Sequence, residues 1–199
     1  MNQRATRLAL VLGAFVAGLV LCFGVIVLVT GSRSATGALQ VPAIGGPFHL
    51  VDQDGRPASD QDLKGKPFLV FFGFTYCPEI CPTTLFDVSE VLRNLGPDAD
   101  RTAALFITVD PERDTPAALK DYLASFDPHL RGLTGDAAAL AAAAKAYRVY
   151  YKKVPLDGGG YTMDHTAIVY LMDKDGRFVA PFNLKRKPEV AAAELRKYL

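Results

Sequence analysis

One uncharged apolar run near the N-terminus limits most strongly what this chain can fold into. From Leu8 to Thr30 the sequence contains no Asp, Glu, Lys or Arg. A helix of about 23 residues, at about 1.5 Å per residue, just exceeds the roughly 30 Å hydrocarbon core of a bilayer. A cleaved signal peptide is the alternative, but its apolar region would span only about 7–15 residues and would end in small residues. The run therefore predicts one transmembrane helix over residues 8–30.

The charges that flank this run predict its orientation. Arg4 and Arg7, together with the amino terminus, outnumber Arg33 on the other side. The positive-inside rule then places the N-terminus in the cytoplasm. We expect a single-pass protein of the bacterial inner membrane whose domain lies in the oxidising periplasm. Cys22 follows bulky residues rather than the small ones of a lipoprotein signal, so we expect an inert thiol buried in lipid.

The composition of the chain excludes several classes of protein. Half of the 199 residues are apolar, 22% are charged and three are cysteine. These proportions exclude a disordered chain and a disulfide-dense small protein. The formal net charge is +1, and the only basic block outside the N-terminal region is 185–187. We therefore expect no nucleic-acid partner.

The chain divides into four predicted segments. Residues 1–7 form a short cytoplasmic N-terminus, 8–30 the transmembrane helix, 31–41 a flexible linker of small and polar residues, and 42–199 one globular domain.

The predicted domain alternates buried strands with helices. Its expected elements are a hairpin from residue 48, a buried strand over 67–72, a helix from Pro82 to residue 95, a strand over 103–109, helices over 116–126 and 136–147, a hairpin of 166–172 with 177–180, and a helix over 188–199. This order predicts an α/β fold: a thioredoxin-like mixed sheet flanked by helices, preceded by one N-terminal transmembrane helix.

Two cysteines stand where the first buried strand meets the following helix. Cys77 and Cys81 are four residues apart, so a disulfide between them would close a small loop and remove little chain entropy. A helix N-terminus lowers the pKa of nearby thiols, and we expect both sulfurs to ionise easily. A redox pair or a metal-binding pair therefore explains them better than a structural disulfide.

A metal would need a third ligand, and the chain has three histidines. His129 follows a helix in a turn, where we expect it to be solvated, and His49 lies in the first hairpin as a half-buried strand residue. His165 is expected to begin an apolar strand after the glycine loop 158–160, a position that suits a ligand. Two cysteines and one histidine favour copper, particularly Cu(I), although zinc is not excluded by chemistry alone.

Five blocks of the sequence resemble the Sco/SenC family. They are residues 72–85, 108–116, 133–136, 146–151 and 164–167, in order along nearly the whole domain. The resemblance implies a membrane-tethered thioredoxin-like metallochaperone, not an enzyme, that binds Cu(I) or Cu(II) through Cys77, Cys81 and His165. It also implies a role in assembly of the binuclear copper centre of cytochrome c oxidase. The implied partners are the oxidase subunit that holds this centre and a second periplasmic copper donor. Tyr76 departs from the family, where many members have histidine.

Three further residues could contribute to the site. Asp110 and Asp114 could supply a hydrogen bond or a weak ligand, but capping of the helix near Pro116 is the better interpretation. Met163 is a candidate soft ligand, but we interpret it as a packing residue.

Two other functions remain open: thiol-disulfide exchange with another protein through the redox-active Cys77–Cys81 pair, and a cysteine peroxidase, for which a separate resolving cysteine is lacking.

Overall fold

The computed structural model describes residues 3–31 and 43–199, and the chain divides into two compact units, residues 1–41 and 42–199. In the first unit, helix α1 covers Gln3–Gly31. Within the described ranges, no helix combines the length and the apolar character that crossing a membrane requires. The predicted linker, 31–41, lies outside the described residues apart from its first position.

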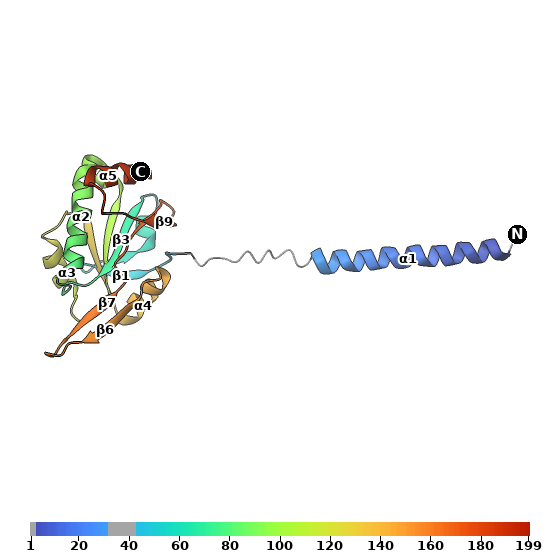
Figure 1. The fold of residues 1–199 in the computed structure, drawn as a ribbon, viewed down its shortest axis with the longest axis horizontal. Helices are drawn as coiled ribbons and strands as arrows, with labels where there is room; N and C mark the ends of the chain where they lie inside the picture. The colour runs from blue at the N-terminus through green and yellow to red at the C-terminus, as the bar shows by residue number, and fades with distance from the viewer. Residues whose placement is uncertain (1–2, 32–42) are drawn as a thin grey trace. The chain divides into compact units, whose positions relative to one another are not determined.

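In the second unit, seven strands form one mixed sheet (Figure 1) in the order β2-β1-β5-β4-β3-β8-β9. The strands are β1 (His49–Asp52), β2 (Pro57–Ser59), β3 (Phe68–Gly73), β4 (Ala103–Thr108), β5 (Leu130–Thr134), β8 (Val169–Met172) and β9 (Phe178–Pro181). The central strands β3, β4 and β5 are parallel, whereas β1 and β2, and likewise β8 and β9, pair antiparallel. All six residues of β3 are buried, as its continuous apolar run predicts.

Helices cover both faces of this sheet. They are α2 (Ile80–Leu95), α3 (Pro116–Leu123), α4 (Ala137–Ala146) and α5 (Pro188–Arg196), with short 3-10 helices at Asp60–Leu63 and Gly96–Arg101. Alternate residues of β3 serve the two faces. Phe71 stacks on Phe106 of β4 on the face where α2 lies, and Phe72 contacts Tyr147, which caps the end of α4. The predicted mixed sheet flanked by helices is confirmed.

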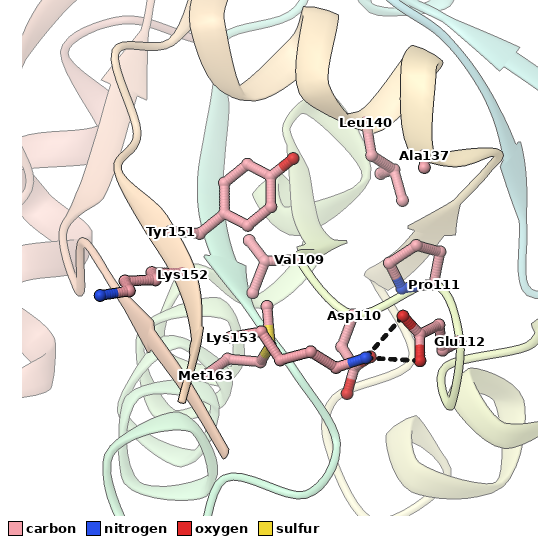
Figure 2. Close-up of a pocket in the computed structure, with 10 residues that line it drawn as sticks. All are labelled: Val109, Asp110, Pro111, Glu112, Ala137, Leu140, Tyr151, Lys152, Lys153 and Met163. Carbon is pink, nitrogen blue, oxygen red and sulfur yellow. Dashed lines mark hydrogen bonds and ion pairs between the residues drawn. The ribbon is translucent and has the colours of Figure 1, made fainter. Parts of the chain in front are cut away.

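A second, two-stranded sheet stands apart from the main one. Strands β6 (Tyr151–Pro155) and β7 (Tyr161–His165) pair antiparallel, and their turn contains Gly159 and Gly160, both with positive φ. A pocket separates this hairpin from the loop after β4 and from α4 (Figure 2). At its rim, Lys153 of β6 forms an ion pair with Glu112 at 2.7 Å.

The structure corrects three predictions. His165 ends β7 instead of beginning β8, which starts at Val169. Helix α2 begins at Ile80, so Pro82 is its third residue, still within the first turn where a proline costs no hydrogen bond. Strands β5, β6 and β7 were not predicted at all.

Candidate metal centre

A short loop, residues 74–79, connects β3 to α2 and contains the first cysteine; we call it the cysteine loop. Cys77 lies in this loop and is partly exposed, whereas Cys81 is the second residue of α2 and is fully buried. Gly73 makes room for Cys81, because a Cβ atom at Gly73 would lie 2.8 Å from its sulfur. The backbone N–H of Cys81 donates to the sulfur of Cys77 at 3.3 Å, so the free amides of the helix N-terminus face that sulfur.

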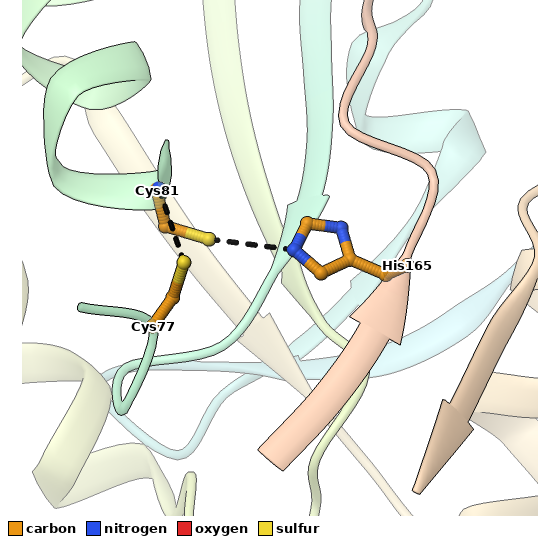
Figure 3. Close-up of side chains that lie close together, drawn as sticks. All are labelled: Cys77, Cys81 and His165. Carbon is orange, nitrogen blue, oxygen red and sulfur yellow. Dashed lines mark hydrogen bonds between the residues drawn. The ribbon is translucent and has the colours of Figure 1, made fainter. Parts of the chain in front are cut away.

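The histidine comes from β7, on the other side of the site. The His165 ring packs edge-on against Phe74 and Phe71, with ring centroids 5.8 and 6.1 Å away. Its Nδ1 lies 3.2 Å from the Thr166 carbonyl oxygen, which can only accept, so Nδ1 carries the proton. The other nitrogen, Nε2, lies 3.6 Å from Cys81 Sγ and presents its lone pair to the cysteines (Figure 3).

Burial controls the protonation of the site. It lowers the pKa of His165, which keeps the imidazole neutral and able to ligate. Burial also raises the pKa of Cys81 far above its ordinary value, and the nearby sulfur of Cys77 adds to this. The expectation that both thiols ionise easily is therefore wrong for Cys81, because desolvation of the buried sulfur disfavours its thiolate form and raises the pKa. A bound cation would displace that proton and take its place beside the sulfur.

The structure brings together all three residues that the sequence selects. One ligand atom each from Cys77, Cys81 and His165 lies within 4.8 Å of the other two. Two sulfurs and a neutral imidazole nitrogen form a donor set that suits a soft cation such as Cu(I). The residues present therefore fit copper.

The other histidines lie elsewhere. His49 is exposed at the start of β1, not half-buried. His129 is not simply solvated, because its two ring nitrogens lie 2.7 Å from Asp127 and 3.1 Å from Asp100.

The two aspartates of the 108–116 block support the site without joining it. Asp114 is fully buried and accepts hydrogen bonds from the Thr75 backbone and hydroxyl, at 3.0 and 2.6 Å, and from the Thr108 hydroxyl at 2.6 Å. Asp110 pairs with Arg113. Neither aspartate caps α3, whose N-cap is Thr115. Both carboxylates accept hydrogen bonds from other groups of the protein instead.

Met163 and two residues that carried no sequence prediction lie next to the centre. Met163 is buried in β7 and lines the same pocket as Cys77 and His165. Arg113 contacts Tyr76 of the cysteine loop and Tyr161, which is the first residue of β7. Arg113 lies inside one of the blocks that resemble Sco/SenC, but an arginine in a polar stretch carries no signal of which rings it will stack on.

Comparison with known proteins gives a consistent result. The family model described as SCO1/SenC matches residues 36–199. The structure of Bradyrhizobium japonicum ScoI with copper bound is 66% identical, with a TM-score of 0.77 over 79% of this chain and 100% of that chain. The structure of yeast Sco1 with copper bound is 38% identical, with a TM-score of 0.72 over 79% of this chain and 88% of that one.

A curated mammalian relative is longer than the matched region. The mitochondrial SCO1 homolog of Mus musculus is 43% identical over 165 residues, which are 79% of this chain but only 58% of that protein. The chain thus spans less than two thirds of that relative's length.

Proposed function

This chain belongs to the SCO1/SenC family, and on that premise we propose that it is a copper metallochaperone. In this proposal Cys77, Cys81 and His165 bind one copper ion as cargo, as Cu(I) or Cu(II). The chain then delivers copper to the binuclear copper centre of cytochrome c oxidase, or prepares that centre to receive it. The partners are the oxidase subunit that holds the centre and a second periplasmic protein that donates copper.

The convergence of two sulfurs and one imidazole nitrogen within 4.8 Å supports this proposal most directly. A structural zinc site almost always has four protein ligands, whereas this group offers three. Cu(I) accepts a low coordination number and prefers sulfur, and the neutral imidazole extends the set toward Cu(II). The copper named in the descriptions of the Bradyrhizobium and yeast structures agrees with this choice.

We further propose that residues 8–30 hold the domain at the periplasmic face of the bacterial inner membrane, with residues 1–7 in the cytoplasm. The uncharged sequence of that run and the excess of arginine before it support this placement. A tether would keep the copper site close to a membrane-bound recipient.

Copper titration of the reduced full chain in detergent tests the function. We expect one copper ion per chain and, with Cu(II), thiolate-to-copper charge-transfer absorption. Cys77→Ser or Cys81→Ser should abolish binding. Cys22→Ser is the matched control, because Cys22 lies outside the metal group, and it should bind as the wild type does. Unchanged affinity in a Cys77→Ser or Cys81→Ser variant would exclude this site.

Thiol-disulfide exchange on the recipient is the second candidate function. The contact between the Cys81 amide and the Cys77 sulfur favours it, because a helix N-terminus stabilises an attacking thiolate. The variant His165→Ala separates the two functions. If the chain is a metallochaperone, this variant should lose Cu(II) binding and fail to support assembly of the oxidase copper centre in cells. If it is a reductase that needs only the two thiols, the variant should support this assembly as the wild type does.

A further inference from the structure

We propose that Arg113 is a positioning residue for the metal centre: its side chain holds the cysteine loop against strand β7, which carries His165. This inference rests on the proposed function, since it concerns the same three ligands. The two halves of the centre come from different parts of the fold. The cysteines follow β3 of the main sheet, whereas His165 ends a hairpin that belongs to a separate two-stranded sheet.

Arg113 contacts the cysteine loop through two aromatic rings. Its guanidinium carbon lies 4.5 Å from the ring centroid of Tyr76, the residue before Cys77, and 5.8 Å from that of Phe74. Phe74 in turn packs edge-on against the imidazole of His165. A displacement of this loop would therefore move a ligand and the ring that supports another ligand.

The same guanidinium contacts β7. It lies 3.8 Å from the ring centroid of Tyr161, and its Nη1 donates to the Tyr161 carbonyl oxygen at 3.0 Å. Its Nε donates to Asp110, and the Tyr161 hydroxyl donates to the other oxygen of the same carboxylate at 2.9 Å. Asp110 thus neutralises the guanidinium and joins it to β7 a second time. Tyr161 lies four residues before His165 on the strand.

Burial indicates which of two ionic contacts holds the hairpin. The pair between Lys153 and Glu112 also joins it to the loop after β4, but these side chains are 45% and 65% exposed, and such pairs contribute little. Arg113 is 21% exposed and Asp110 only 2%, so their charge-assisted bonds act in a less polar environment. A planar guanidinium can stack on Tyr76 and Tyr161 while it donates in its own plane, which an ammonium cannot do.

The test measures the Cu(I) affinity of the reduced full chain in detergent, by competition with a chromophoric Cu(I) chelator. Arg113→Ala should weaken binding on the order of tenfold, because stacking and two directed hydrogen bonds are lost together. Arg113→Lys should recover only a small part of this loss. Arg177→Ala is the matched control: Arg177 is exposed, pairs with Asp173 and Asp175 outside the centre, and should leave the affinity unchanged.

Repeating the Arg113→Ala substitution in the His165→Ala variant separates a role in positioning His165 from a role in the general stability of the domain. In His165→Ala, where the ligand on β7 is already absent, Arg113→Ala should weaken Cu(I) binding much less than in the wild type. In the metal-free protein, Arg113→Ala should speed amide hydrogen exchange in residues 151–165 while the amides of β3 and β4 keep their rates. The inference is overturned by an unchanged affinity in Arg113→Ala, by equal losses in both backgrounds, or by faster exchange throughout the domain. Absence of copper binding in the wild type would instead contradict the proposed function, and the exchange experiment would still test the role of Arg113.

Discussion

Gly73 has no side chain, and this leaves the room that the sulfur of Cys81 occupies. A Cβ at Gly73 would lie 2.8 Å from the Cys81 sulfur and 2.6 Å from a ring carbon of Phe106, both closer than real contacts allow. We expect Gly73→Ala to lower the free energy of unfolding by about 1–3 kcal/mol, as overpacking of a core does, and to weaken copper binding because the sulfur must move. Denaturant unfolding and copper titration measure the two effects.

Gly158→Ala is the control for this substitution. Its added Cβ would meet nothing within 4 Å, and its φ is not positive, so we expect both quantities to stay unchanged. A Gly73→Ala variant with wild-type stability and affinity would show that the packing around Cys81 is looser than these contacts imply.

His129 predicts a pH dependence of stability that is independent of the metal centre. Its hydrogen bond to Asp127, followed by the bond to Asp100, raises the pKa of His129 in the folded state. The stabilisation is therefore fully present below the unfolded value of about 6.5 and is lost as the pH rises through the higher folded pKa. The side chain is 34% exposed, so the effect should stay below about 1 kcal/mol.

Unfolding free energies of the wild type and His129→Gln, measured across this pH range, isolate the contribution. The difference between the two proteins should shrink as the pH rises. His165, whose pKa burial lowers, contributes with the opposite sign in both proteins and therefore cancels. A difference that grew with pH would contradict the assignment.

At the scale of elements, Asp114 ties the end of β4 to the start of the cysteine loop. It accepts from Thr108 on one side and from Thr75 on the other. Removing the carboxylate leaves buried donors without an acceptor, so we expect Asp114→Ala to cost about 2–4 kcal/mol of unfolding free energy. Denaturant unfolding measures this cost, and Asp157→Ala, an exposed change in the β6–β7 turn, should be neutral. A neutral Asp114→Ala would mean that the two threonines find other acceptors.

The elements that could be predicted from the sequence are those whose burial leaves a periodic pattern. Strand β3 is a continuous apolar run, and α2 repeats apolar residues at helical spacing. Strand β6 places two exposed lysines side by side between a half-buried Tyr151 and Val154, so its sequence lacks the alternation of apolar and polar residues that marks a strand. In β5, Gly132 weakens the strand signal, yet it is required because a Cβ there would lie 2.7 Å from Leu123 of α3. That requirement arises only from tertiary packing.

The candidate site was more predictable than its support. Soft donors are rare, so the chain offers few combinations of cysteine and histidine, and the structure places Cys77, Cys81 and His165 together. Arg113 could not be selected in the same way, because the chain contains many basic residues and only tertiary contacts distinguish this one.

At the scale of the whole molecule, the proposed role of the N-terminal run as a membrane anchor can be tested directly. If residues 8–30 span the inner membrane, the full-length chain should remain in the membrane fraction after alkaline washing, because lipid burial does not depend on ionic contacts. Protease added from the periplasmic side should release a soluble fragment that contains the domain, while the N-terminal residues stay protected.

Replacing Phe15 and Leu19 by arginine should abolish this behaviour. Each charge near the middle of a span adds about 2.5–3.5 kcal/mol to the free energy of membrane insertion. Two such charges therefore remove most of the favourable insertion free energy of a helix of this length. The control variant carries the same two arginines at exposed positions of the domain, Gln61 and Asp157, and should stay in the membrane. Immunoblotting of the membrane and soluble fractions measures both. Recovery of a soluble, shortened wild-type chain would identify the run as a cleaved signal, and a full-length soluble chain would show that the run does not anchor the protein.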